Sequence, residues 1–405
     1  MSARRNPAGL LLAMVTCANA QDASVHGYLD CRLLAPSSST SWAEGGLGKT
    51  RFGGGDFRAS CVQGGLVGTW QVVPSVLAVA DIQYETSGPD TASVLEAYLR
   101  YRPVSTTPLR ASVKLGEFFP PISLENSAIG WTSPWTLTPS AINSWVGEEL
   151  RSIGLEGQLE WRGQADSVTG VTALMRSNDP AGELLAARGW ALSDLTSGLG
   201  TRVREPDVYA IDNHARVPLR FNPFLENDGR LGWYAGGSWQ APGTARITLL
   251  RYDNRADPST HSDGASPVFS WRTRFWSAGA EADWQNFVIL AQAVTGSTEI
   301  APLPTFSSTT DFRAAYVLLG WSVEPWRVAV RVDTFATAQL PRTLADRTRE
   351  HGNAATIALN WRPVAWLRLT TEFVAVRSDR NQRIEAGISP QQTDRQFQIG
   401  ARLLF

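Results

Sequence analysis

The last eleven residues of the chain alternate between apolar and polar side chains, and this pattern limits what the remainder can fold into. Alternate positions from Phe397 to Phe405 are all apolar, and Leu404 is the single apolar residue of the other set. A period of two predicts a β-strand with one apolar face and one wet face. Such a strand needs hydrogen-bonding partners on both edges, and the preceding sequence has to supply them.

The N-terminus has the pattern of a secretory signal. Two arginines precede the apolar run 9–15, and Ala-Asn-Ala at 18–20 provides small residues before a cleavage site. A basic head, a short apolar run and such an ending are typical of a signal peptide. We therefore expect residues 1–20 to be a signal peptide and the exported chain to be 21–405.

The charge balance gives no indication of nucleic acid as a partner. The chain has 37 basic and 38 acidic side chains, and the signal removes two of the basic ones. A nucleic-acid-binding domain would show a basic excess instead. Only Lys49 and Lys114 are lysines, so almost every cation is an arginine. A GC-rich genome explains this bias, and so does a wall of guanidinium groups that attracts anions.

Sixteen strand-like segments follow the signal, and none approaches the ~20 apolar residues of a membrane helix. Seven short turns lie with both termini on one side, and eight longer loops lie on the other, which is the asymmetry of outer-membrane barrels. The predicted strands are 25–34, 59–72, 75–85, 94–102, 109–116, 150–162, 167–176, 230–240, 244–252, 272–284, 287–295, 312–322, 326–335, 353–362, 366–377 and 395–405.

Aromatic residues recur at one level of these strands. Every strand that runs towards the short-turn side ends in an aromatic near the turn: Trp70, Tyr101, Trp161, Trp239, Trp284, Trp321, Trp361 and Phe405. Such rings settle at the lipid–water boundary. A soluble β-sandwich or propeller would place its tryptophans in a core and does not explain this spacing. The sequence predicts an all-β fold, a 16-stranded antiparallel transmembrane β-barrel in the bacterial outer membrane.

The faces opposite the apolar ones carry charge, so the predicted barrel is wet inside. Unpaired charges are too costly for a dry core, and sixteen strands leave room for a water-filled channel. We expect these residues to face the lumen: Glu96, Arg327, Arg331 and Asp333.

In its closing strand, its turn asymmetry and its long third loop, the mature chain resembles the sixteen-stranded porins of Gram-negative outer membranes. The resemblance implies that loop 3, about 117–149, folds into the barrel and narrows it. The constriction candidates are Glu117, Glu125, Asn126, Glu148 and Glu149 on the loop, facing Arg100, Arg102, Arg110 and Lys114 on the wall. Acids opposite bases would set up a transverse field that orients polar solutes. A structured external cap is the alternative for this loop.

The same resemblance implies several partners. These are outer-membrane lipid, the barrel assembly machinery that reads the end at Phe405, small solutes and two further copies in a homotrimer. The many arginines also resemble the basic ladder of phosphate-selective porins, although Glu96, Glu156, Glu160 and Asp333 are interleaved with them.

Cys31 and Cys61 lie on the first predicted hairpin. The exported compartment is oxidising, and cross-strand neighbours are within disulfide range. The pair forms either a disulfide or two lipid-facing free thiols.

Other functional classes find little support. The near P-loop at residues 43–50 lies in an external loop, where glycines make turns and no strand or helix flanks it as the motif requires. The four histidines lack metal-ligand spacing, so we expect no metal, no cofactor and no enzyme activity. We expect a porin for passive diffusion of small hydrophilic or ionic solutes. The alternative is a plugged structural or receptor-type barrel whose loop 4, about 177–228, binds a partner.

Overall fold

Sixteen antiparallel strands form one closed barrel in a computed structural model of the chain, which describes residues 23–86, 92–212, 218–264, 266–340 and 346–405. The expected signal peptide and His214 lie outside these residues. The barrel strands are β1 (Ala23–Pro36), β2 (Arg58–Val73), β3 (Val76–Glu85), β4 (Ala92–Tyr101), β5 (Leu109–Phe118), β6 (Ser152–Arg162), β7 (Ser167–Arg176), β10 (Gly232–Ala241), β11 (Ala245–Asp253), β12 (Arg272–Trp284), β13 (Phe287–Leu303), β14 (Phe306–Val323), β15 (Trp326–Leu340), β16 (Glu350–Val364), β17 (Leu367–Arg380) and β18 (Gln391–Leu404).

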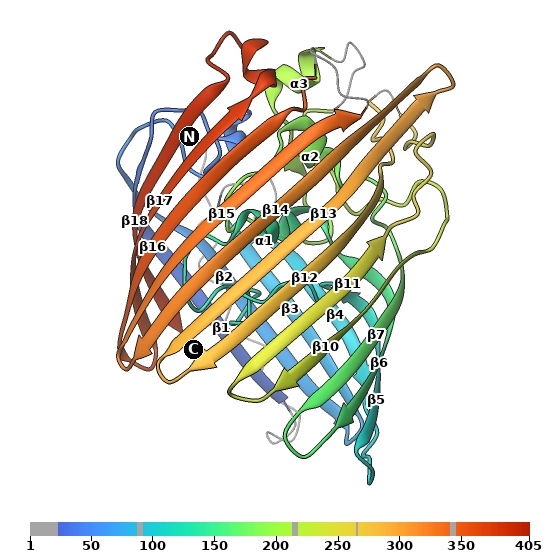
Figure 1. Ribbon diagram of the computed structural model, residues 1–405, viewed down its shortest axis with the longest axis vertical. Coiled ribbons are helices and arrows are strands. Elements are labelled where there is room, and N and C mark those ends of the chain that lie inside the picture. The colour runs from blue at the N-terminus through green and yellow to red at the C-terminus, as the bar shows by residue number, and fades with distance from the viewer. Residues whose placement is uncertain (1–22, 87–91, 213–217, 265, 341–345) are drawn as a thin grey trace, which may run out of the picture.

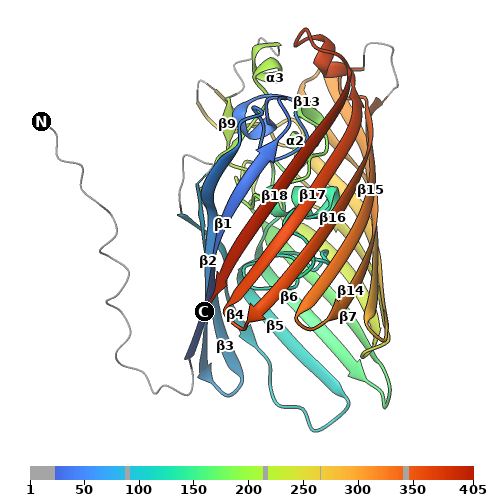
Figure 2. The same cartoon turned by 90° about the vertical axis from the view of Figure 1, so that its left-hand side faces the viewer.

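Each strand pairs with its sequence neighbour, and the closing strand pairs with the first one (Figures 1 and 2). Tyr28 is opposite Leu404 in the β1–β18 register, and the backbones of Gly27 and Phe405 exchange two hydrogen bonds of 2.8 and 3.1 Å. Closure leaves no strand edge exposed to lipid, where an unpaired backbone group would cost on the order of several kcal/mol. The predicted fold class is confirmed.

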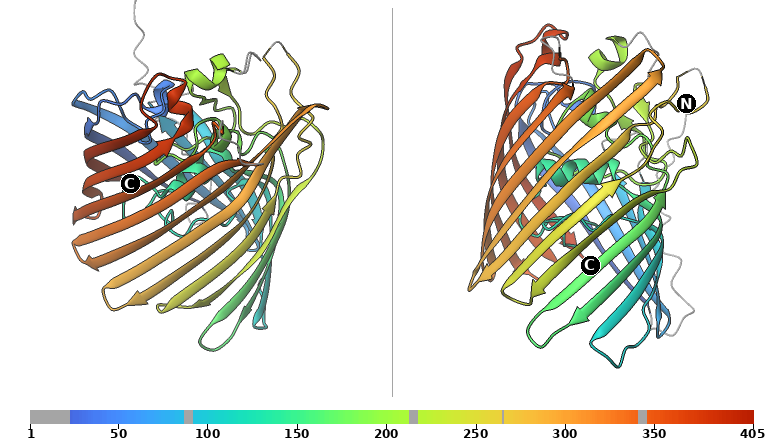
Figure 3. Two further views of the ribbon diagram at one scale, coloured as in Figure 1. Left: turned by 45° about the horizontal axis from the view of Figure 1, so that its top comes forward. Right: turned by 45° about the vertical axis from the view of Figure 1, so that its right-hand side comes forward.

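The outer surface of the barrel is apolar and carries the expected aromatic girdle. Trp70 and Phe405 are 50% and 64% exposed, and the neighbouring rings of Trp326 and Trp361 stack with centroids 5.5 Å apart. These residues lie next to the short turns. Figure 3 shows those turns at the lower end of the barrel. Exposed tryptophans at one level next to a ring of leucine and valine side chains define a lipid–water boundary.

The loop expected between residues 295 and 312 is instead the top of a long hairpin. Strand β13 continues to Leu303 and β14 begins at Phe306, with Thr298 opposite Thr310. Its polar threonines and serines suggested a loop. The two strands pair their backbones here, and Thr298 and Thr310 face each other across them. The sheet therefore continues beyond the apolar band.

The other loops contain short elements that the sequence did not predict. They are α1 (Ala141–Glu149), α2 (Glu183–Ala187), α3 (Asp207–Asp212), two 3₁₀ turns (Trp42–Glu44 and Asn381–Ile384) and a small sheet of β8 (Val203–Arg204) and β9 (Arg220–Phe221). No helix among the described residues is long and apolar enough to cross a membrane.

Cys31 and Cys61 are register partners on β1 and β2, and their sulfur atoms are bonded. A cross-link between paired strands next to the seam restricts the unfolded chain.

We expect the mature protein to be resistant to thiol labelling until it is reduced. Denatured but unreduced protein should take up no maleimide, and reduced protein should take up two equivalents by intact mass. Labelling of the unreduced chain at both positions would identify free thiols instead.

Candidate functional site

Loop 3, residues 119–151, lies inside the barrel and carries α1, which Figure 1 shows enclosed by the strands. Ser140 caps the helix, because its hydroxyl accepts a hydrogen bond from the Asn143 N–H at 3.2 Å. Every residue of α1 is buried, including Glu148 and Glu149. A helix buried on all sides at the centre of a barrel fills the lumen at that level.

Arg331 on β15 is the main anchor of loop 3. Its guanidinium donates to the backbone oxygens of Thr138 and Pro139 at 2.8 and 2.9 Å, and it lies 3.3 Å from Glu125 and 2.9 Å from Asp333. Arg331, Glu125 and Asp333 are all completely buried. One arginine thus neutralises an acid of the loop and an acid of the wall.

Further wall residues bind the backbone of loop 3. Glu372 on β17 accepts from the N–H groups of Leu137 and Thr138 at 2.6 and 3.1 Å, and Asn360 on β16 donates to the Trp135 oxygen at 2.8 Å. The Trp135 ring lies so close to Gly320 that a Cβ there would be 2.6 Å from it. The polar inward face of β15–β17 therefore positions the loop.

The described parts of loop 4, residues 177–212 and 218–231, fill the mouth above loop 3. Trp190 is fully buried, and it donates from its backbone N–H to Glu350 at 2.9 Å and from its indole to the Ala336 oxygen at 3.1 Å. Its ring belongs to an aromatic cluster at the barrel axis with Trp145 of α1 and Phe312 of β14. Loops 3 and 4 thus share one apolar core inside the barrel.

Ion pairs join loop 4 to the other internal loops. Arg188 pairs with Glu148 of α1, and Asp194 lies 3.0 Å from Arg51 of loop 1 and 2.5 Å from Arg32 of β1. These groups are all buried. We name the described parts of loops 1, 3 and 4 together the plug: residues 37–57, 119–151, 177–212 and 218–231.

Lys49, the lysine of the near P-loop sequence, belongs to the plug. Its ammonium pairs with Glu350 and donates to the Arg188 oxygen at 2.8 Å. Burial lowers the pKa of Lys49 to about 7, and the Glu350 carboxylate opposes that effect.

The structure does not bring the predicted loop acids together with the predicted wall cations. Glu125 contacts Arg331, Glu148 contacts Arg188, and Glu149 accepts from the Leu184 N–H at 2.9 Å. Glu117 belongs to β5, with Arg151 as its nearest cation at 4.0 Å. The loop crosses the lumen to β13–β17, which removes its acids from β4 and β5.

The predicted wall cations stay on the far side from these acids. Arg100 is opposite Lys114 in the β4–β5 register, and Lys114 pairs with Glu156 at 3.0 Å. Arg110 is opposite Glu160, while Arg102 lies beyond the end of β4. Asn126 is buried in loop 3, with neither atom of its side-chain amide hydrogen bonded.

Of the residues expected in the lumen, Glu96 accepts from the Phe119 N–H at 3.0 Å, and Arg327 donates to the Ser322 hydroxyl at 3.2 Å. Sequence reasoning missed Arg188 and Glu350. Their signal was weak, since isolated charges in long polar loops are usually solvated.

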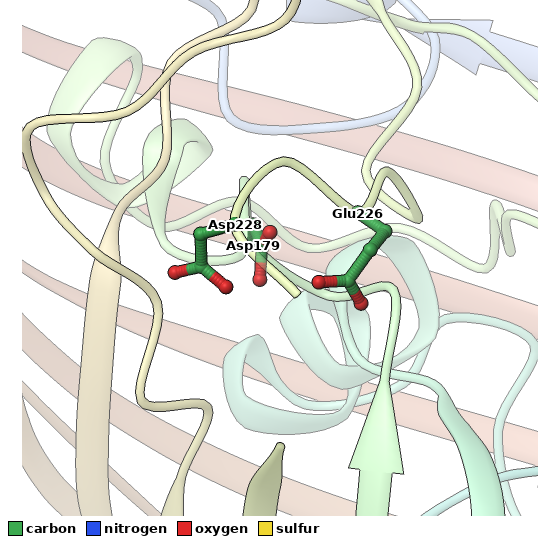
Figure 4. Close-up of side chains that lie close together, drawn as sticks. All are labelled: Asp179, Glu226 and Asp228. Carbon is green, nitrogen blue, oxygen red and sulfur yellow. The ribbon is translucent and has the colours of Figure 1, made fainter. Parts of the chain in front are cut away.

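An acidic cluster closes the neck of loop 4. Carboxylate oxygens of Asp179, Glu226 and Asp228 lie within 4.8 Å of one another (Figure 4). Burial and the two neighbouring acids raise the pKa of Asp179 to about 7. Each carboxylate accepts a backbone N–H, for example from Asn227 to Asp179 at 2.5 Å. The cluster therefore orders the two ends of the loop.

Below loop 3, the turn-side half of the lumen is open. It contains a cavity of about 890 Å³ along β14–β18 and two smaller ones of about 390 and 210 Å³ near β11–β13. We name the largest the turn-side cavity. The barrel therefore has a packed mouth and an open base.

No family model matches the sequence, and no curated protein matches it either. Solved structures match almost the whole chain. A loop-deletion mutant of OmpT, an outer membrane protein of Vibrio cholerae, has a TM-score of 0.55 at 9% identity and covers 95% of this chain and 99% of its own. The outer membrane channel DcaP of Acinetobacter baumannii has a TM-score of 0.55 at 11% identity, covering 95% and 97%. An anion-selective porin from Comamonas acidovorans has a TM-score of 0.50 at 9% identity, covering 95% and 99%.

These likenesses show the fold. The chain is a sixteen-stranded barrel with the architecture of Gram-negative outer-membrane porins.

We expect Arg331→Met to destabilise the barrel by about 3–5 kcal/mol, because Glu125 and Asp333 would remain buried without their cation. Urea unfolding in detergent measures the change. Arg313→Met, at an exposed position on β14, is the matched control. Equal midpoints for the two variants would contradict the anchoring role.

We expect the plug to loosen as the pH rises. Burial raises the pKa of Glu149 to about 8 from its ordinary 4.5. The packed loop therefore holds a proton that the released loop loses, so packing weakens between about pH 4.5 and 8. Hydrogen exchange of residues 182–192, corrected for intrinsic rates, measures this.

Glu149→Gln stays neutral and should weaken that pH dependence. The part due to the other buried acids of the plug remains, among them Asp179 and Glu205, whose pKa values burial also raises to about 7. Glu160→Gln, next to the turns, is the control and should keep the full dependence. An unchanged slope in Glu149→Gln would contradict the assignment.

Proposed function

We propose that this protein is an outer-membrane porin that admits small hydrophilic or ionic solutes by passive diffusion. The observation that carries the proposal is the closed sixteen-stranded barrel, whose charged inward face surrounds open cavities on the turn side. Sixteen strands enclose a lumen wide enough for water and solutes. The channels among the similar structures support the same reading.

In this proposal the plug is the gate of the pore. Its buried ion pairs and shared aromatic core pack the loop side of the lumen, so solutes cross only when loop 4 moves or is displaced. The proposal keeps a constriction of the pore by acids and cations, but with different pairs from those predicted. Glu125 and Arg331 hold loop 3 in place, while Lys114 and Glu156 line the opposite wall.

Three narrower statements belong to this proposal. The chain assembles as a homotrimer, as OmpT of Vibrio cholerae does in one solved form. The assembly machinery recognises its end at Phe405. The arginines of the lumen that lack counter-ions make the pore favour anions, and selectivity for phosphate is the most specific form of that preference.

A second candidate is favoured by one observation. The packed loop 4 is what a plugged receptor-type barrel would show, with a partner binding to the outer part of the loop. Conductance separates the two candidates.

We expect the purified protein in a planar bilayer to give small or intermittent currents, and a loop-4 deletion to give steady ones. Replacing residues 178–229 with a short Gly-Ser linker preserves the β7–β10 pairing, in which Met175 is opposite Gly232. Shortening the tip of the β13–β14 hairpin, at residues 301–308, is the control and should leave the currents unchanged.

The reversal potential under a salt gradient then gives the ion preference. Anion selectivity with block by phosphate would support the phosphate-selective version. A folded loop-4 deletion that carries no current would overturn the porin proposal and favour the receptor-type barrel.

A further inference from the structure

The turn-side cavity has a cationic side. It lies between loop 3 and the wall of β14–β18, and four arginines line it: Arg327, Arg362, Arg368 and Arg402. Among the described residues, neither Arg327 nor Arg368 has a carboxylate within ion-pair distance. An open cavity in this barrel thus borders two arginines without counter-ions.

Arg368 and Arg402 face each other directly in the β17–β18 register. Like charges in such a position destabilise a sheet. Arg402 is compensated, since it lies 2.6 Å from Asp30 and donates to the Thr132 hydroxyl at 2.9 Å. Arg368 makes one long hydrogen bond, 3.3 Å to the Ser133 oxygen, and its Nε and Nη2 are buried without a partner.

The surrounding charges add to this excess. The guanidiniums of Arg402, Arg327 and Arg32 all repel that of Arg368, and Asp30 is the acid that attracts it. Asp30 is already shared by Arg32 and Arg402 at 2.9 and 2.6 Å. Buried donors without acceptors are costly, and an anion between Arg368 and Arg327 would remove the cost.

The rest of the lining is mixed. Its polar side chains are Ser127, Thr132, Ser322, Glu324 and Asn360, and its apolar part includes Tyr28, Ile129, Pro134, Pro325, Val364 and Leu404. Inorganic anions would gain nothing from the apolar groups. A planar carboxylate matches the two parallel donors of an arginine, and an apolar body would bury its surface against the opposite side.

We propose that the turn-side cavity is a binding site for small organic carboxylates with an aromatic or aliphatic body, held by Arg368 and Arg327. The site lies on the open side of the plug, so binding there does not depend on current through the barrel. A non-conducting barrel would still bind such a carboxylate, and a conducting barrel without this site would not.

The test is calorimetric titration of the purified, detergent-solubilised barrel at low salt with benzoate, acetate and inorganic phosphate. We expect benzoate to bind more tightly than acetate and phosphate. Arg368→Gln should weaken benzoate binding about tenfold or more, as expected for loss of a charge-assisted hydrogen bond. Arg327→Gln should also weaken it and gives a second variant if the first does not fold.

Arg377→Gln, on the same strand at an exposed position, is the matched control and should bind like the wild type. Heat-modifiable gel mobility verifies that each variant is folded. Absence of benzoate binding to the folded wild type would overturn the proposal, as would equal affinities in all three variants. Tighter binding of phosphate than of benzoate would overturn the assignment to organic carboxylates.

Discussion

Backbone pairing without an edge is the constraint on which the rest of this structure depends. In lipid no water replaces a missing strand partner, so the sheet has to close on itself. Closure joins β1 to β18 through the end of the chain, where Gly27 and Phe405 exchange hydrogen bonds. It also fixes which face of every strand points inward, and thereby collects the inward-facing charges in one lumen.

The charges inside the lumen are used differently on the two sides of loop 3. On the loop side, arginines and acids are paired in a buried interior, as in Arg331 with Glu125 and Arg188 with Glu148. Such pairs contribute specificity of packing more than stability, because desolvation offsets much of their attraction. On the turn side, Arg327 and Arg368 border an open cavity without such partners. The first arrangement closes a pore, and the second attracts solutes.

Gating and solute binding are therefore separate tasks in this barrel. The plug is held by buried groups whose protonation differs from that of a released loop, among them Glu149 and Lys49. Its packing thus responds to pH, while the turn-side cavity depends on Arg327 and Arg368, which lie on the barrel wall outside the plug. Loop movement would change the rate of passage without changing what the cavity prefers.

The sequence by itself determined the barrel. Alternation, turn lengths and the aromatic girdle are local patterns, and each follows from a strand that has lipid on one side and water on the other. It predicted the inward face of Arg331 and Asp333 for the same reason. The partners of these residues depended on the tertiary structure, because Glu125, Arg188 and Asp194 lie in loops without periodicity. Their ion pairs join residues 40 to 206 positions apart, and only the path of the loops through the lumen decides which charges meet.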